Sequence, residues 1–383
     1  MIIQRPKLIH QLRATLRQNP VTALLGPRQC GKTTLALTLD LGRKSTYFDL
    51  ENPLDRARLQ NPLRALENLK GVVVIDEIQR QPELFELLRV LSDRRPLQTH
   101  FLILGSASLE LIRRSSESLA GRIAFVDMGG FSLTEIGFQK LYRLWFRGGF
   151  PRSFLARTEA DSAAWRENFI RTFLERDIPQ LGIRVPSLTL RRFWTMVAHY
   201  HGQIWNGSEI GASLGIAHTT SRQYLDVLTG AFVIRELPPW FENTGKRTVK
   251  SPKVYIRDSG LLHSLLRITD FRGLEEHPKL GASWEGFVLE QILNSAGERD
   301  AYFWATHGGA ELDLILIRRG KRWGFEIKYA DAPTLTKSMG IAKKDLRLKH
   351  LWVIYPGKKA YPLEEGIDCI GLGELEGLAR KFL

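Results

Sequence analysis

The chain has 383 residues, 43% of them hydrophobic, which predicts two or three folded domains and excludes a disordered chain. The formal net charge of +14 favours a polyanionic partner, nucleic acid before membrane headgroups, although solubilising surface charge is the other explanation. Two cysteines are too few for a disulfide scaffold, and neither a secretory signal nor a membrane-spanning apolar run is visible, so we expect a cytoplasmic protein without a membrane partner.

The first motif follows a short apolar run, residues 21–25, which predicts a buried strand. It fits the phosphate-binding pattern G-x-x-x-x-G-K-[ST], and a predicted helix follows at residues 34–41. Backbone N–H groups and the helix N-terminus would then surround an anion. We predict that Lys32 reaches the β- and γ-phosphates of ATP and that Thr33 holds Mg²⁺. The predicted nucleotide-binding residues here are Gly26, Pro27, Arg28, Gln29, Cys30, Gly31, Lys32, Thr33 and Thr34.

A second strand that ends in carboxylates completes the predicted nucleotide site. Residues 71–77 are an apolar β-branched run closed by an Asp-Glu pair, which is typical of a parallel strand buried on both faces. We predict that Asp76 holds the Mg²⁺ shell and that Glu77 polarises the attacking water as general base. A third apolar strand, residues 101–104, leads to Ser106, which would contact the γ-phosphate or the water, or else cap a helix.

The remaining elements of the first third alternate between helix and strand. Residues 7–17 and 82–91 have helical spacing of apolar side chains, and residues 47–50 and 123–126 read as further strands. Strands that alternate with helices predict an α/β fold with a doubly wound parallel sheet.

These motifs together resemble those of the archaeal-type AAA+ ATPases, which carry a characteristic C-terminal domain. The resemblance rests on the P-loop, VIDEIQ at 74–79, LGSAS at 104–108 and SLAGR at 118–122, and it extends over the whole chain. It implies ATP hydrolysis with Mg²⁺ in a homo-oligomer, a hexameric ring being one form. It also implies that Arg122 senses or contacts nucleotide, although an ion pair would explain this arginine equally well. Further candidates for an arginine finger are Arg113, Arg114 and Arg176.

The middle of the chain predicts a helical connector and then a DNA-binding module. Residues 139–190 are helical and aromatic, and the resemblance implies a lid. Residues 208–216 and 218–228 read as two helices around a glycine turn, and residues 232–237 as a strand, which together match a winged helix-turn-helix. Such modules also bind proteins, but the basic charge favours DNA. The predicted DNA contacts are Thr219, Thr220, Ser221, Arg222, Gln223, Lys246, Arg247 and Lys250.

The last third carries a second set of acidic residues. Glu285 lies in a predicted helix, Asp313 in a strand, and Glu326 shares one face of the next strand with Lys328. The order resembles the PD-(D/E)XK nuclease core, in which carboxylates bind Mg²⁺ and the lysine helps to place the attacking water. The alternative is a nuclease-like, restriction-endonuclease-like α/β domain whose site is dead.

The resulting prediction is a chain of four domains. They are an AAA+ ATPase core at 1–138, a helical lid at 139–190, a winged helix-turn-helix at 191–256 and a nuclease-like domain at 257–383. We expect an ATPase that couples hydrolysis to binding and to remodelling or translocation of DNA, branched DNA included. Two alternatives stay open: an ATP-dependent oligomeric switch that binds a protein partner, and an ATP-licensed Mg²⁺-dependent DNA nuclease.

Overall fold

The computed structural model describes residues 3–39, 45–106, 117–180, 185–241, 249–375 and 377. The chain forms two compact units. The first comprises residues 1–130 together with 230–232, and the second comprises the rest. Among the described residues, no helix combines the length and the apolar character needed to cross a membrane.

Five strands form one parallel sheet in the first unit, in the order β2-β3-β4-β1-β5. Their bounds are Val21–Gly26 for β1, Ser45–Asp49 for β2, Gly71–Asp76 for β3, Thr99–Ser106 for β4 and Ile123–Asp127 for β5. All residues of β1 and all but the first of β3 are buried, as expected of strands covered on both faces. The sheet confirms the predicted parallel α/β core.

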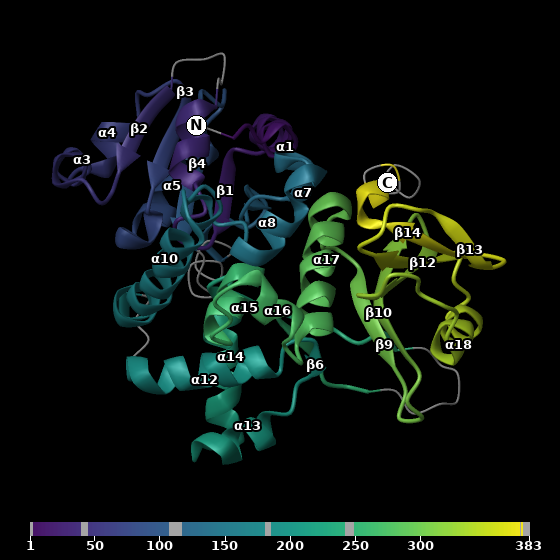
Figure 1. Ribbon diagram of the computed structural model, residues 1–383. Helices are drawn as coiled ribbons and strands as arrows, with labels where there is room; N and C mark the ends of the chain where they lie inside the picture. Colours follow the sequence, from purple (N-terminus) through teal and green to yellow (C-terminus); the bar gives the residue numbers. More distant parts are fainter. Residues whose placement is uncertain are drawn as a thin grey trace. The chain divides into compact units, whose positions relative to one another are not determined.

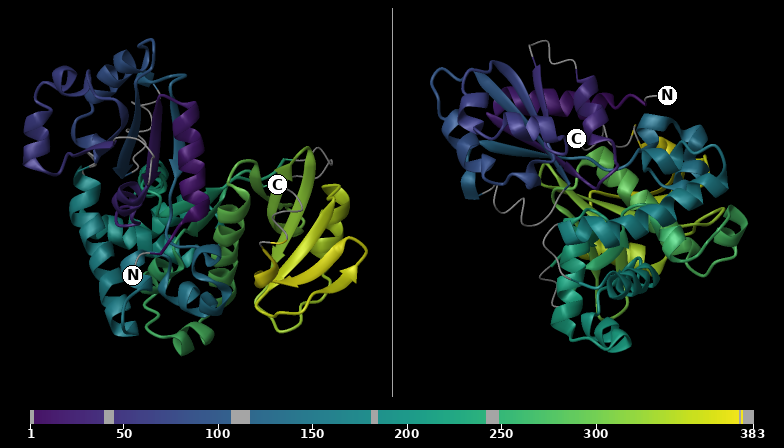
Figure 2. Two further views of the ribbon diagram at one scale, coloured as in Figure 1. Left: turned by 90° about the horizontal axis from the view of Figure 1, so that it is seen from above. Right: turned by 90° about the vertical axis from the view of Figure 1, so that its left-hand side faces the viewer.

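Helices cover both faces of this sheet (Figure 2). They are α1 (Pro6–Gln18), α2 (Lys32–Thr38), α3 (Pro53–Arg58), α4 (Pro62–Leu66) and α5 (Leu84–Ser92), with a 3₁₀ turn, η1, at Ile78–Arg80. On one face, Leu84 and Leu88 of α5 pack in a cluster with Phe101 of β4. On the other face, α1 buries Leu8 and Leu12 beside β1 and β4. Because parallel strands carry their loops at the same edge, this layering brings the ends of β1 and β3 together.

The second unit begins with a bundle of short helices. Their bounds are Leu133–Ile136 for α7, Phe138–Lys140 for η2, Leu141–Arg147 for α8, Pro151–Phe154 for α9, Glu159–Thr172 for α10, Phe173–Asp177 for the π-helical turn η3, Ile178–Gln180 for α11 and Ser187–His199 for α12. The chain breaks between α8 and α9, where Gly148 has a φ of 76° and Gly149 N donates to Asp258 at 2.7 Å. The glycines are required because a Cβ at Gly148 would lie 2.1 Å from that carboxylate.

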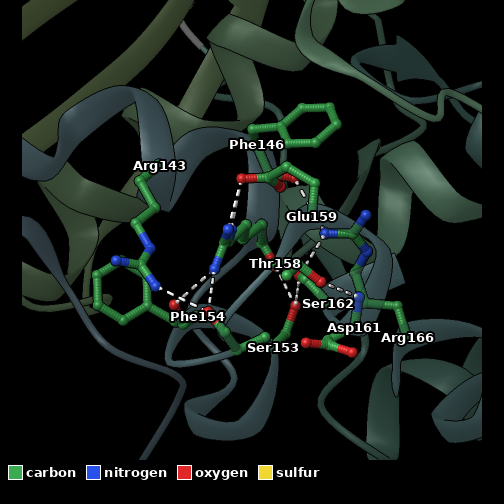
Figure 3. A network of polar contacts seen from close by, with 11 residues as sticks. Arg143, Phe146, Ser153, Phe154, Thr158, Glu159, Asp161, Ser162 and Arg166 are labelled. Atoms are coloured by element: carbon green, nitrogen blue, oxygen red, sulfur yellow. Dashed lines mark hydrogen bonds and ion pairs between the residues drawn. The ribbon is translucent and has the colours of Figure 1, made fainter. Parts of the chain in front are cut away.

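A polar network fixes α8, α9 and α10 against one another (Figure 3). Arg166 is 1% exposed, and its Nη1 donates to Ser162 Oγ at 3.1 Å and to the Phe146 carbonyl at 3.4 Å. Ser153 and Ser162 share a hydroxyl hydrogen bond of 2.8 Å, and Glu159 accepts from the Arg147 guanidinium at 2.6 Å. The buried arginine and serine groups are thereby hydrogen-bonded, and the network links the three helices.

A small antiparallel sheet with the order β6-β8-β7 follows α12. The elements are β6 (Gln203–Ile204), α13 (Gly207–Leu214), α14 (His218–Gly230), β7 (Ile234–Leu237) and β8 (Lys253–Ile256). Gly215, with a φ of 68°, ends α13 as the predicted glycine turn.

A six-stranded mixed sheet with the order β13-β14-β12-β11-β10-β9 forms the last part of the chain. The strands are β9 (Ala301–Ala305), β10 (Glu311–Arg318), β11 (Lys321–Ile327), β12 (His350–Tyr355), β13 (Tyr361–Glu364) and β14 (Ile367–Gly371). The helices are α15 (Ser259–Leu265), α16 (Phe271–Glu275), α17 (Leu280–Ala296) and α18 (Lys337–Asp345), with a final 3₁₀ turn, η4, at Leu372–Glu374. Figure 1 shows α17 and α18 on opposite sides of the strands.

The two described parts of the segment that joins β7 to β8, residues 238–241 and 249–252, pair with β9 at the edge of this large sheet. Trp240 N donates to the Phe303 carbonyl at 2.6 Å, and Phe303 N donates to the Pro238 carbonyl at 3.0 Å. On the far side of the joining segment, Val249 N donates to the Ala305 carbonyl at 3.2 Å. Backbone hydrogen bonds therefore fix both described parts of the predicted wing to β9.

Candidate nucleotide site and carboxylate cluster

The loop after β1 has the backbone shape of a phosphate cradle. Gln29 and Gly31 have φ values of 63° and 101°, so the chain curls back on itself before α2 begins at Lys32. The Lys32 ammonium is buried and donates to the Gly26 and Pro27 carbonyls, each at 2.9 Å. Lysine is thus held inside the loop, where a phosphate would meet it, and α2 directs its N-terminus to the same place.

Close packing beneath the loop fixes its position. Gly26 has no room for a side chain, since a Cβ there would lie 2.0 Å from the Met128 carbonyl oxygen. The Cys30 thiol is 1% exposed and lies 3.5 Å from that same oxygen. The strand-to-loop turn therefore depends on the residue just after β5 as well as on the motif itself.

Asp76 is the centre of a hydrogen-bonded group at the end of β3. Its Oδ2 accepts from the Thr33 hydroxyl at 2.6 Å and from the Tyr47 hydroxyl at 2.6 Å. Burial and the Asp76 carboxylate raise the pKa of Tyr47, which keeps that phenol a neutral donor. The Thr33 and Asp76 oxygens are hard ligands that suit Mg²⁺, which is usually held by one or two protein oxygens together with waters and substrate phosphates. These two residues fit the predicted metal position.

Tyr47 is a residue of this site that sequence reasoning missed. It lies on β2, directly beside β3, where Tyr47 pairs in register with Val74. Strand β2 was predicted from its apolar residues. The signal that could have identified Tyr47 was its position on a strand next to the one that ends in Asp76.

Glu77 directly follows β3 and has a left-handed backbone with a φ of 55°, uncommon for a residue with a Cβ. Such strained conformations cluster at functional sites. Burial raises the pKa of Glu77, while the charges of Arg28 and Lys32 oppose the shift. The side-chain amide of Gln79 contacts the Glu77 carboxylate. A half-buried carboxylate with a raised pKa is the chemistry expected of a general base.

Arg28 and Arg80 both contact Glu51, at 2.9 and 2.8 Å. The P-loop residue Arg28 is thereby linked to the segment after β2 and to the turn after Glu77. Thr34 lies on α2 with its side chain exposed. The structure thus brings the predicted P-loop, Asp76 and Glu77 to one edge of the sheet.

Ser106 and Arg122 lie at different ends of β1. The register pairs the Ser106 backbone with Gly26, beside the P-loop, although its side chain falls outside the described residues, as do Arg113 and Arg114. The Arg122 carbonyl accepts from Val21 N, the first residue of β1. At about 3.3 Å per residue, β1 separates Arg122 from the P-loop by about 17 Å. Its guanidinium forms a two-pronged ion pair with Asp93 at 2.6 and 2.8 Å.

Two of the four predicted nuclease-like residues, Glu285 and Asp313, lie against a fifth residue, Lys253. Lys253 of β8 is 2% exposed, and its ammonium lies 3.2 Å from Glu285 of α17 and 3.5 Å from Asp313 of β10. It also contacts Glu311. Burial opposes the lysine charge, yet Glu285 and its neighbours hold the Lys253 pKa well above its ordinary value. The side-chain ammonium of Lys253 thus lies between two of the carboxylates that a nuclease-like site would use to bind Mg²⁺.

The other members of the cluster are also engaged. Tyr255 donates to Glu285 at 2.6 Å, and Asp313 Oδ2 accepts from Ile327 N at 2.8 Å. Lys328 lies 2.7 Å from Glu326 Oε1, whereas Oε2 of Glu326 is buried without a hydrogen-bond partner. Burial raises the pKa of Glu285 to about 7 and, together with Asp313, that of Glu326 to about 8. Within the described residues, no group of three or more His, Cys, Asp or Glu side chains is disposed to hold a metal ion.

Comparison with known proteins places the chain in a family. The uncharacterized protein Rv2008c of Mycobacterium tuberculosis is 51% identical over 370 residues, which cover 97% of this chain and 84% of that protein. The uncharacterized protein Mb2031c of Mycobacterium bovis matches with the same figures. The chain belongs to their family.

Family models divide the sequence into three parts. Residues 18–137 match an AAA domain, residues 138–272 the domain of unknown function DUF8612, and residues 280–375 the domain of unknown function DUF4143. The AAA match and the P-loop agree, so this family carries a P-loop ATPase domain of the AAA class.

Solved structures resemble the chain only weakly. A Walker-type ATPase of Pyrococcus abyssi matches with a TM-score of 0.48 and 16% identity. The match covers 69% of this chain and 96% of the chain of that ATPase. The DNA clamp loader delta protein of Bacillus subtilis has a TM-score of 0.26 and 13% identity, with 57% and 86% covered. These scores are too low to bear on function.

The predicted DNA contacts divide into exposed and engaged residues. Thr219 and Gln223 are exposed on α14, and Thr220 is half-buried. Ser221 is fully buried, and its hydroxyl donates to the Gly207 carbonyl at 2.8 Å, so the prediction that Ser221 faces DNA is wrong. The Arg222 guanidinium pairs with Glu236 and Asp226, each at 2.6 Å. Lys250 is exposed, whereas Lys246 and Arg247 lie outside the described residues.

Proposed function

We propose that this protein is a Mg²⁺-dependent ATP hydrolase whose turnover is coupled to the binding and remodelling of DNA. The observation that carries the ATPase part is the meeting of Thr33, Asp76 and Glu77 beside Lys32 at one edge of a parallel sheet. Phosphoryl transfer needs a cation clamp, a metal ligand pair and a residue that orients water, and these residue types meet that need.

Each residue has a distinct part in the proposed reaction. Lys32 exchanges its two carbonyl partners for phosphate oxygens, because an ammonium prefers an anion to neutral carbonyls. Thr33 and Asp76 would hold Mg²⁺, which neutralises charge on the phosphates when bound. Glu77 accepts a proton from the attacking water and orients it in line with the γ-phosphate.

We also propose that the ATPase works as an oligomer, with a ring of six subunits as one form. Arg122 lies at the end of β1 opposite to its own P-loop, so it does not reach its own nucleotide. The Arg122 side chain is half-buried and pairs with Asp93, and we propose that it exchanges this partner for the nucleotide of a neighbouring subunit. Arg176, in the π-helical turn, is the second candidate, because its side chain is exposed even though it pairs with Asp177 at 3.1 Å.

The DNA part rests on the order of elements in the second unit and on charge. The succession α12, β6, α13, α14, β7 and β8, with strands in the order β6-β8-β7, is the one expected of a winged helix. The net charge of +14 favours a polyanion. A protein partner remains the alternative, in which ATP orders an assembly and the DUF4143 part only docks that partner.

Mg²⁺-dependent DNA cleavage is less well supported. The convergence of Glu285, Asp313, Glu326 and Lys328 favours it, but the ammonium of Lys253 already balances Glu285 and Asp313. A buried lysine and a divalent cation compete for the same carboxylate charge. We therefore propose that the domain at residues 257–383 serves as a binding domain and not as a nuclease.

Stimulation of ATP turnover by DNA distinguishes an ATPase that remodels DNA from an ATP-dependent switch that binds a protein partner. ATP hydrolysis by the wild type is measured with Mg²⁺ alone and then with single-stranded, duplex or four-way-junction DNA. The proposal predicts that at least one DNA form raises kcat several-fold and thereby identifies the preferred structure. Slow turnover that no DNA changes would contradict the coupling and favour the switch.

A further inference from the structure

A basic recess lies on the large sheet, and it shares no residue with the nucleotide site or the carboxylate cluster. It has a volume of about 560 Å³ and lies between the turn that joins β10 to β11 and the loop that joins α18 to β12. The lining residues are Gly320, Lys321, Arg322, Arg347, Leu348 and Lys349. Four of these six carry a positive charge, and none of the described lining residues is acidic.

The backbone holds the two sides of the recess together. Gly320, with a φ of 72°, lets the chain turn tightly so that Arg318 pairs with Lys321. Lys349 N donates to the Arg322 carbonyl at 2.8 Å, and Arg322 Nη1 donates to the Leu346 carbonyl at 2.9 Å. The hairpin turn and the loop before β12 are therefore cross-linked, and the recess is preformed.

Arg322 is held in place by an aromatic ring as well. Its guanidinium carbon lies 5.2 Å from the ring centre of Trp240, which lies in the segment that pairs with β9. A cation–π contact of this kind orients the guanidinium plane. The segment between β7 and β8 thus supports the recess.

The other three cations of the recess carry charge that the described chain does not neutralise. Lys321, Arg347 and Lys349 are exposed, and in the part of the chain that the structure describes their side chains make no ion pair or hydrogen bond. Arg222 and Lys253 differ from these three residues because carboxylates neutralise their charge. Arg222 pairs with Glu236 and Asp226, and Lys253 lies among carboxylates. Three positive charges therefore lie close together in the recess without a negative partner from the described chain. An anionic ligand would reduce the repulsion between them.

We propose that this recess binds phosphate groups of a nucleic-acid strand. Phosphodiester oxygens accept from lysine and arginine without regard to sequence, and a recess of this size admits more than one phosphate of a strand. The assignment deepens the proposed DNA function and rests on it. It assigns the main contact with the DNA phosphates to β11 and the α18–β12 loop. Helix α14, in contrast, offers chiefly neutral side chains to DNA.

Two matched double variants test the assignment in the full-length protein. Lys321→Gln with Lys349→Gln removes two charges from the recess. Lys358→Gln with Lys359→Gln removes two exposed lysines from the loop between β12 and β13. Binding of a fluorescent single-stranded or duplex oligonucleotide is measured by anisotropy over a series of salt concentrations. We expect the recess variant to bind at least tenfold more weakly at low salt, with a log–log salt slope lower by about 2, since each lost phosphate contact removes about 0.9.

The control variant is expected to bind within twofold of the wild type. An equal loss in both variants would overturn the site, because binding would follow net charge alone. A wild type that binds DNA while the recess variant is unaffected would overturn the recess and leave the proposed function standing. A wild type that binds no DNA would overturn both.

A free anion is the other source of phosphate chemistry. Inorganic phosphate is added at the same ionic strength as a chloride control during the binding measurement. The proposal predicts that both salts displace the oligonucleotide equally, because the recess recognises a strand and not a single anion. Stronger displacement by phosphate would make it a free-phosphate site and overturn the nucleic-acid assignment.

Discussion

At the scale of single residues, the nucleotide site depends on carboxylates in contrasting surroundings. Asp76 accepts hydrogen bonds from Thr33 and Tyr47. Glu77, the next residue, is half-buried, and desolvation raises its pKa. Adjacent groups with such different environments commonly divide their roles between binding charge and moving a proton.

The raised pKa of Glu77 predicts the pH dependence of catalysis. A general base acts only when ionised, so kcat/KM for ATP rises with pH through the pKa of Glu77 in the free enzyme and then levels off. Because burial raises that pKa, we expect the acidic limb to be centred above the ordinary glutamate value of 4.5. The measurement is kcat/KM across the pH range in which circular dichroism shows the fold intact. A limb centred at or below 4.5 would contradict the role assigned to Glu77.

At the scale of elements, the strand-to-loop turn at Gly26 shows how the motif depends on a distant segment. Sequence pattern predicted β1, the loop and α2, because an apolar run, two glycines and a helical spacing are local signals. It did not predict that the Met128 carbonyl closes over Gly26. That contact joins residues about a hundred positions apart and has no local signature.

We expect Gly26→Ala to destabilise the first unit. The new methyl group would lie 2.0 Å from a backbone oxygen, so β1 or the segment after β5 must shift. Overpacking of this kind typically costs about 1–3 kcal/mol, and urea denaturation followed by circular dichroism measures the loss. Gly129→Ala is the matched control, since its Cβ meets nothing within 4 Å and should change stability by less than about 0.5 kcal/mol. Equal stability of the two variants would contradict the packing described here.

The second unit shows where local patterns stop being informative. Strands β10 and β11 and helix α17 were predicted from the sequence, and the acidic residues on them do converge. Lys253 was missed as their partner, because it lies on β8, about thirty positions before Glu285. The pairing of Pro238 and Trp240 with Phe303 of β9 was likewise hidden, since backbone hydrogen bonds between distant segments leave no residue signature.

At the scale of the whole molecule, a basic chain carries one ATPase unit and one larger unit of helices and two sheets. The net charge of +14 is a property of the composition alone. The positions of the individual basic residues say more about function than the total does. Lys253 is buried among carboxylates and serves the fold. Lys321, Arg347 and Lys349, in contrast, lie together on the surface and are exposed to solvent. The proposed phosphate contact therefore depends on these uncompensated charges, whereas the broader DNA proposal rests on the order of elements in the second unit and on the net charge.

The family's AAA domain makes ATP hydrolysis the central claim. The most direct test compares steady-state ATP turnover by the wild type and by Glu77→Gln, with Mg²⁺ and with the metal removed by chelation. We predict that the wild type turns over only with Mg²⁺ and that Glu77→Gln lowers kcat by about a hundredfold or more, in line with the loss of a general base. ATP affinity should stay within about threefold, because Lys32 and the loop are unchanged. Turnover that is equal in the two proteins, or independent of Mg²⁺, would contradict the account.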